Sequence, residues 1–364
     1  MRSELLEELK ELTYFFSTRT RVSSSEGIKE SQDKVREFIK RKLKLPFIEE
    51  SFEVDKNIPI EASIKLNGTQ VKGYPFVGSL WGDREAEVVR EDEDVNGKIA
   101  LVEVGGEREG EKVKKLKERG AVGAIFYLEE LESPYIGNVS DEPYMALSVD
   151  RETAKALLGK KVRIESKVRK LRVKGKNIYF DIGKGPFLYI MAHLDSKPFV
   201  YGALDNAVAV AFLLILAKEL RDSYYFPFRL RFLVTDGEEL GLEGAKHHVK
   251  NLKHTYYAIN IDSIGWLNPA VIYKDSEGFN GEKIMEKFYK HLRDLKIDIP
   301  FREGKRGRSD HIPFKQKGVE TLFLSSNPFT FRHTFYDNYE AIDWDVMDMW
   351  FDVLSSFLRR FHKL

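Results

Sequence analysis

The 364-residue sequence contains no cysteine. This absence excludes disulfide bonds, thiol nucleophiles and thiolate metal sites, and it leaves His, Asp and Glu as the possible metal ligands. Long apolar runs are also lacking, because the longest, residues 207–217, is far shorter than the roughly 20 residues of a membrane span. The first residues, MRSELLEELKEL, are charged where a secretory signal would be apolar. We therefore expect a cytoplasmic protein with no membrane partner.

An excess of charge of one sign is missing as well. The chain has 59 Lys and Arg against 58 Asp and Glu, so its net charge of +1 gives no global field to hold a nucleic acid. What it does have is 42% hydrophobic residues, enough to fill a large core. Its length exceeds the ~250–300 residues at which one core stops growing, which predicts two domains or one domain with an insertion. The 32% of charged residues, against a typical ~25%, suggests thermophile-like surface ion pairs.

The pattern of apolar residues and turn signals changes along the chain and divides it into two parts. Apolar spacing predicts helices at residues 3–16 and 31–43, followed by a strand at about 47–54. Residues 57–167 then read as short strands with turn signals and one charged helix, GEKVKKLKERG, and they contain no histidine. We expect an inserted small β-rich domain at 57–167, acting as a lid or binding module, and a main domain formed by residues 1–56 and 168–364.

After Lys167 strands and helices alternate, which predicts an α/β fold with a mixed, mostly parallel sheet and helices on both faces. The apolar strand runs are 187–192, 230–235, 256–261 and 321–326. A nearly wholly apolar stretch at 206–220 predicts a buried helix.

Polar residues gather just beyond these strands, where open α/β sheets bind their ligands. His193 and Asp195 follow the first run, Asp236, Glu238 and Glu239 the second, and Asp262 the third. His333 follows the fourth run after a loop, and Asp205 stands at the start of the buried helix. Singly, each has an ordinary interpretation: a strand-end histidine is often only a satisfied polar residue, and an Asp before a helix is a common N-cap. Together they crowd carboxylates whose repulsion a divalent cation would relieve.

The inventory of two histidines and three carboxylates suits two zinc ions about 3.5–4 Å apart that share one carboxylate. One carboxylate is then left over. Because the adjacent Glu238 and Glu239 point in different directions at a strand end, one can bind metal while its neighbour takes a proton from water. The pattern therefore predicts hydrolysis.

Six segments, AHLDS, GALDNA, DGEELGLEGA, NIDSIG, SDHIPF and RHTFYDN, occur in this order over residues 192–338. Together they resemble the zinc exopeptidase family that includes bacterial leucyl aminopeptidases, glutamate carboxypeptidase II, the transferrin receptor and glutaminyl cyclase. Residues 57–167 resemble the protease-associated domain inserted in many of these peptidases, which implies a lid or gating role.

The resemblance implies five ligands for two Zn²⁺ ions: His193 and Asp262 on one ion, Glu239 and His333 on the second, and Asp205 bridging both. It also implies that Glu238 is the general base and that Asp195 orients the imidazole of His193. Co²⁺ or Mn²⁺ suit the same ligand types as substitutes, because affinity order alone does not choose the metal in a cell.

Three further residues lie in motifs near the expected cleft. Asp310 and His311 match a family loop that borders the substrate, and a structural role for His311 is the simpler interpretation. Arg332 stands where family peptidases commonly have a Tyr whose hydroxyl helps to hold the oxyanion. Three roles stay open for Arg332: stabilising the oxyanion, binding a substrate carboxylate, or facing solvent.

The function implied is a metallo-aminopeptidase that hydrolyses N-terminal residues from peptides with a free N-terminus. The nearest rival is a glutaminyl cyclase acting on N-terminal Gln, because HLDSK, DGEE and DHIPF look similar to the cyclase forms. GALDNA is closer to the peptidase form, which favours the peptidase. So does the inserted domain, which the compared cyclases lack, and those cyclases hold one zinc where two are expected here. A carboxypeptidase or dipeptidase of the same family, and a receptor without metal chemistry, also stay open. The oligomeric state stays open, and in a homo-oligomer the inserted domain could cover a neighbour's cleft.

Overall fold

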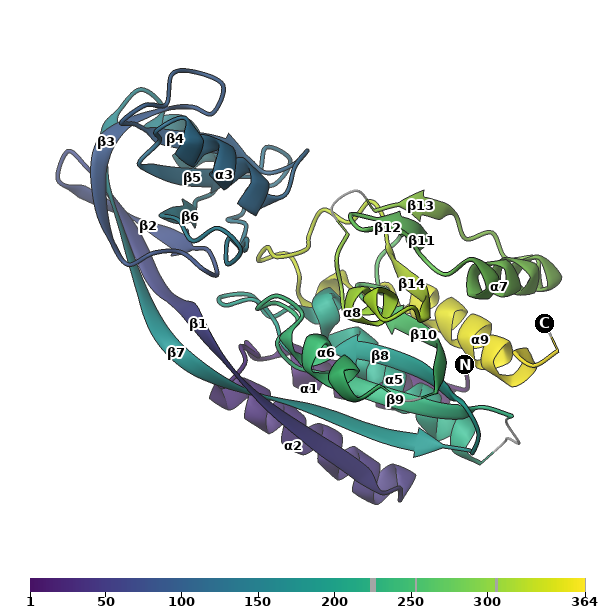
Figure 1. Cartoon of the computed structure of the whole chain (residues 1–364). Coiled ribbons are helices and arrows are strands. Elements are labelled where there is room, and N and C mark those ends of the chain that lie inside the picture. Colours follow the sequence, from purple (N-terminus) through teal and green to yellow (C-terminus); the bar gives the residue numbers. More distant parts are fainter. Residues whose placement is uncertain (223–226, 253, 305–306, 364) are drawn as a thin grey trace.

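The computed structural model describes residues 1–222, 227–252, 254–304 and 307–363. A larger body and a smaller unit are joined by two very long strands, β1 (Phe47–Leu66) and β7 (Lys161–Ile182). These strands pair in antiparallel fashion along nearly their whole length, so they form an arm that leaves the body and carries the smaller unit at its far end (Figure 1).

The body is built on a mixed sheet whose centre is parallel. Its central strands are β8 (Phe187–His193), β9 (Arg229–Thr235), β10 (Thr255–Ile261) and β14 (Glu320–Ser326). Antiparallel strands flank them, β7 beside β9 and β11 (Pro269–Asp275) beside β14, and the short β12 (Gly278–Phe279) and β13 (Phe301–Glu303) pair with β11. The four predicted apolar runs match these central strands to within one residue, because strands buried on both faces read as continuous apolar runs.

Helices cover both faces of this sheet, which confirms the predicted fold class. One face packs against α1 (Ser3–Ser17), α2 (Glu26–Phe38) with its π-helical end η1 (Ile39–Leu43), α5 (Val208–Arg221), α7 (Glu282–Leu295) and α9 (Trp344–Arg360). The opposite face packs against α6 (Glu243–His248), η3 (Val249–Asn251) and α8 (His311–Gln316). The predicted buried helix is α5, and the short turns η2 (Ala203–Ala207) and η4 (Tyr339–Ala341) complete the body.

The smaller unit is a sheet with a core on each face. Its elements are β2 (Thr69–Pro75), β3 (Gly82–Arg90), β4 (Ile99–Glu103), β5 (Gly123–Tyr127), β6 (Ala146–Ser148), α3 (Glu109–Glu118) and α4 (Arg151–Leu157). The domain boundaries predicted at residues 57 and 167 fall inside β1 and β7, which run through them, so the division at those positions stays a prediction.

Three local expectations were wrong. The strand predicted at 47–54 continues to Leu66, because its charged outer positions are matched by charged positions on β7 and hide the alternation. The second helix begins at Glu26 rather than Ser31, because the Ser25 side chain accepts a hydrogen bond from the Ile28 N–H and caps it. The smaller unit has α4 in addition to the expected charged helix. In the part of the chain that the structure describes, no helix is long and apolar enough to cross a membrane.

Candidate metal centre

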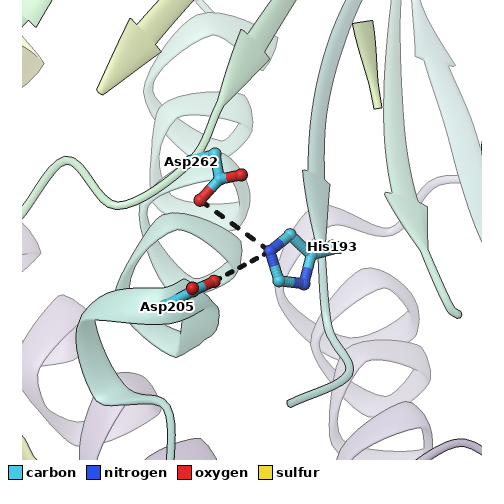
Figure 2. A group of neighbouring side chains, drawn as sticks. All are labelled: His193, Asp205 and Asp262. Atoms are coloured by element: carbon cyan, nitrogen blue, oxygen red, sulfur yellow. Dashed lines mark ion pairs between the residues drawn. The ribbon is translucent and has the colours of Figure 1, made fainter. Parts of the chain in front are cut away.

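The ends of β8 and β10 and the turn before α5 bring three predicted residues together. The Nε2 atom of His193 lies 3.1 Å from Oδ1 of Asp205 and 3.8 Å from Oδ1 of Asp262. Figure 2 shows both carboxylates facing the same ring nitrogen. All three side chains are buried. Parallel strands end at one edge of the sheet, which explains why residues far apart in sequence meet here.

A second group forms around the remaining oxygen of Asp205. The Nε2 atom of His333 lies 3.2 Å from Oδ2 of Asp205 and 3.3 Å from Oε1 of Glu239. Each set of three residues can direct one ligand atom from each member toward a common point. Because the two oxygens of Asp205 face different histidines, this carboxylate lies between the two groups.

The donor atoms fit a divalent cation. Among the described residues, the buried atoms Nε2 of His193 and Oε1 of Glu239 have no hydrogen-bond partner, although buried polar atoms are nearly always paired. Burial opposes a charge on His193, but the neighbouring carboxylates of Glu238, Asp195, Asp205 and Asp262 raise its pKa well above the ordinary value. The carboxylates therefore require positive charge at this place, and imidazole with carboxylate is a ligand set that zinc accepts.

Asp195 lies behind His193, as expected, but its carboxylate has a different contact. The atom nearest Nδ1 of His193 is the backbone oxygen of Asp195, at 3.0 Å, whereas the carboxylate Oδ1 lies at 3.6 Å. The carboxylate instead accepts the backbone N–H groups of Glu238 and Glu239, at 3.1 and 3.0 Å. Asp195 thus fixes the imidazole through its main chain and the acidic turn through its side chain.

Glu238 lines the same cavity as the two groups. Burial, together with the charges of Glu239, Asp262 and Asp310, raises its pKa well above the ordinary value despite the opposing effect of His193. A carboxylate with a raised pKa is suited to accepting and returning a proton. Asp236, from the same turn, does not join the cluster, because it accepts hydrogen bonds from Ser23, Gln32 and the Lys176 N–H.

The cavity above the acidic cluster has a volume of about 130 Å³. The body supplies the acidic cluster, and the smaller unit supplies a wall. The residues of the smaller unit that line it are Arg108, Glu109, Gly110, Tyr135, Asn138, Ser140 and Asp141. Contacts across the wall are direct: the Asn138 side-chain amide donates to the Glu239 backbone oxygen at 2.9 Å, and Arg308 lies 3.6 Å from Asp141.

Arg332 is half-buried and lines this cavity. Burial opposes its charge, but Tyr135, Asp205, Asp262 and Glu239 raise its pKa above the ordinary value. The guanidinium is therefore a permanent positive charge beside the acidic cluster. This placement favours the two cavity-facing roles over the solvent-facing one.

Asp310 and His311 lie in the buried layer next to the cluster. Asp310 accepts a hydrogen bond from Thr235, and burial with nearby charges raises its pKa to about 7. His311 turns toward the sheet edge instead, where its Nε2 atom lies 2.9 Å from Asp275 and its ring packs against Phe323 at a tilt. The geometry agrees with a structural role for His311.

Lys197 is a site residue that the sequence interpretation missed. Its ammonium is buried and lies 2.7 Å from Oε2 of Glu239, and it also donates to the Glu239 backbone oxygen at 3.1 Å. The signal was its position directly after AHLDS, which places it on the loop that leaves β8.

Arg21 is a second missed residue, and no sequence signal marks it. Its guanidinium is fully buried and donates to the backbone oxygens of Phe16, Leu194, Tyr201 and Gly202, at 2.6–2.8 Å. Burial lowers its pKa to about 10, so it stays charged at neutral pH. Arg21 therefore ties the loop between His193 and Asp205 to the first helix.

Asp337 fixes Asp205 from the opposite side. Its two carboxylate oxygens accept the backbone N–H groups of Leu204, at 2.6 Å, and Asp205, at 3.2 Å. Burial raises the pKa of Asp337 to about 7. This residue belongs to the RHTFYDN segment, so the sequence had placed it in a motif without a role.

Comparisons with known proteins show what the chain is similar to. The model of peptidase family M28 matches residues 177–358, half of the chain, and the model of the PA domain matches residues 71–157. Aminopeptidase YwaD of Bacillus subtilis strain 168 is 27% identical over 285 residues, covering 72% of this chain and 62% of the relative. Glutaminyl-peptide cyclotransferase of Bothrops jararaca is 28% identical over 222 residues, covering 48% and 60%.

A similar fold has been solved. The structure of BSAP, a zinc aminopeptidase from Bacillus subtilis, superposes with a TM-score of 0.78 at 22% identity, covering 97% of this chain and 93% of the BSAP chain. The chain spans less than two thirds of the length of the two curated relatives described above.

Proposed function

The chain belongs to peptidase family M28, and on this premise we propose that it is a zinc-dependent aminopeptidase that hydrolyses N-terminal residues from peptides. The observation that carries the proposal is the pair of histidine–carboxylate groups that share Asp205, with Asp205, Glu239, Asp262 and His333 lining one small cavity. The activity of the similar proteins, a YwaD aminopeptidase and a zinc aminopeptidase, supports the same reaction class.

Two zinc ions are proposed, one held by each group. His193 and Asp262 would hold one ion, Glu239 and His333 the second, and Asp205 would contribute one oxygen to each. Bound zinc would supply an acidified water and an electrophile for the scissile carbonyl.

Glu238 is the proposed general base. It accepts the proton of the attacking water and returns a proton to the departing amine, a role for which its raised pKa is suited. Asp195 holds the backbone of both Glu238 and Glu239, so it keeps the base and its neighbouring ligand in fixed relative positions.

Arg332 is proposed to stabilise negative charge on the carbonyl oxygen as the water attacks. Its guanidinium lines the cavity and carries a permanent charge, which is what a developing oxyanion requires.

Cyclisation of N-terminal Gln is a second candidate, and Lys197 is the observation that favours it. An ammonium 2.7 Å from the proposed ligand Glu239 opposes a cation in the second group, and the cyclases resembled by HLDSK hold a single zinc. The inserted unit and the longer match to an aminopeptidase favour hydrolysis.

Metal content and product identity test the proposal together. The full chain would be reconstituted with zinc, desalted, and measured by elemental analysis, then assayed with Leu-amide and with Gln-amide. Two zinc ions and release of free leucine support the aminopeptidase. One zinc with a pyroglutamyl product would transfer the assignment to the cyclase, and absence of bound zinc would overturn both.

A further inference from the structure

The inserted unit reaches the second metal group through Tyr135, which lies between β5 and β6. Tyr135 is 7% exposed, and its hydroxyl oxygen lies 3.4 Å from Nδ1 of His333. The two rings pack with their centroids 5.6 Å apart. The main chain follows the same path, because the Ile136 N–H donates to the backbone oxygen of His333 at 2.9 Å.

The proton of this hydroxyl has a partner of its own. The hydroxyl of Tyr135 donates to Oε1 of Glu109, at the start of α3, at 3.1 Å. A phenol has one proton to give, and its oxygen can still accept. With the proton directed to Glu109, the hydroxyl oxygen can accept a hydrogen bond from Nδ1 of His333.

That arrangement selects one form of the histidine. When Nδ1 carries the proton, the lone pair of the neutral ring is on Nε2, the atom that faces Asp205 and Glu239 at 3.2 and 3.3 Å. A histidine that binds metal needs this form, and a hydrogen bond to its second nitrogen fixes both the tautomer and the ring orientation.

We propose that the inserted domain is part of the metal centre, and that Glu109 and Tyr135 position His333 as a ligand through a carboxylate–phenol–imidazole chain. The inference rests on the metal centre of the proposed function. It goes beyond a lid role, because Glu109 and Tyr135 act on a metal-binding histidine rather than on the entrance to the cavity.

The two metal groups differ in this respect. His193 is oriented by the backbone oxygen of Asp195, which belongs to the body itself. The same nitrogen of His333, Nδ1, has its hydrogen-bond partner in the inserted unit, the hydroxyl of Tyr135. Loss of the Tyr135 hydroxyl should therefore weaken one cation and spare the second.

The test is Tyr135→Phe in the full chain, which keeps the ring against His333 and removes only the hydroxyl. Zinc titration calorimetry of the metal-free protein should show one cation bound about 10–100-fold more weakly, the range for loss of a partner behind a ligating histidine. The absorption spectrum of the Co²⁺-loaded protein should also change. Glu109→Gln should give a smaller loss, because a neutral amide oxygen still accepts the phenol proton.

Tyr144→Phe is the matched control. Tyr144 is equally buried in the inserted unit, and its hydroxyl donates to the Ala121 backbone oxygen away from the cavity. This variant should keep the parental zinc affinities and Co²⁺ spectrum, and a melting curve should show both variants folded.

Zinc affinities of Tyr135→Phe equal to those of the parent would overturn the inference. So would an equal loss in Tyr144→Phe, because the effect would then come from general loosening of the inserted unit. If the parent binds zinc but releases no amino acid from aminoacyl amides, the proposed function fails, and the titration still decides the role of Tyr135.

Discussion

Two buried histidine–carboxylate clusters in the body differ in how their charges are matched. Asp275 lies 2.9 Å from Nε2 of His311 and 3.1 Å from the ammonium of Lys315, and it also accepts the Glu277 N–H. Its negative charge is met by protein groups alone. The cluster is a closed structural unit at the edge of the sheet.

The cluster around Asp205 has the same residue types but a different balance of negative and positive charges. Glu238, Glu239, Asp205 and Asp262 gather near one buried lysine, Lys197. Within the described ranges of the chain, Nε2 of His193 and Oε1 of Glu239 have no hydrogen-bond partner. Nδ1 of His311 also has no hydrogen-bond partner there, so an unpaired atom does not by itself mark a cation site. What distinguishes the cation site from the structural cluster is its surplus of buried carboxylates over buried cations.

The largest expected effect is from Asp205→Asn. The amide offers one oxygen instead of two charged ones, so both groups should lose zinc affinity by more than about 100-fold, beyond the loss expected for an outer partner. Elemental analysis and calorimetry of the desalted protein check this. If the variant retained both zinc ions, Asp205 would not be a shared ligand, and the proposed contrast with the Asp275 cluster would be wrong.

Glu238→Gln is expected to have the next largest effect. Zinc content should remain at the parental level, while kcat for aminoacyl-amide hydrolysis should fall by about 10²–10⁴-fold, the usual contribution of a general base. Parallel metal analysis and steady-state kinetics separate the two properties. Full activity would remove Glu238 as the base, whereas loss of metal would mean that Glu238 and Glu239 have exchanged roles.

Asp275→Asn addresses the structural cluster. Removing one partner of a buried ion pair leaves the ammonium of Lys315 uncompensated, and the free energy of unfolding should fall by about 3 kcal/mol. Urea unfolding of the parent and the variant measures the difference. Zinc content and activity per folded molecule should not change, and a loss of either would show that the two clusters are not separate.

The pH dependence of the same pair gives the smallest effect. Burial opposes ionisation of Asp275, but the hydrogen bond and charge of His311, with hydrogen bonds from the Glu277 N–H and Lys315, outweigh it and lower its pKa below the ordinary 3.8. A lowered pKa stabilises the fold fully above pH 3.8, and the stabilisation is lost as pH falls through the folded pKa. The difference in melting temperature between the parent and Asp275→Asn should shrink as pH falls below that value. A difference that persists at lower pH would refute the pKa shift.

The sequence was most informative about the centre of the sheet. The strands at 187–193 and 320–326 differ by one residue or less at each end from the predicted runs, because a strand with helices on both faces is apolar throughout. It was least informative about β1 and β7. Burial alternates along much of β7 but follows no regular alternation along β1, and charged side chains occupy many exposed positions of both strands, so the length of the arm could not be read from the sequence.

For the candidate site, too, the sequence predicted some features and the tertiary structure decided others. His193, Asp205, Glu239, Asp262 and His333 could be selected from sequence because each follows a strand or precedes a helix. The structure brings all five together. It also shows which neighbours do not join them, since Asp236 pairs with Ser23 and Gln32, and His311 pairs with Asp275.

The sequence by itself determined the fold class, the edge of the sheet where chemistry is possible and the residue types available there. These follow from local patterns, which depend only on which side chains are buried and where strands end. Tertiary structure alone decided the partners: Arg21 under the loop, Lys197 on Glu239, and Tyr135 of the inserted unit on His333. Such contacts join residues up to 198 positions apart, and no spacing in the chain encodes a distance in space.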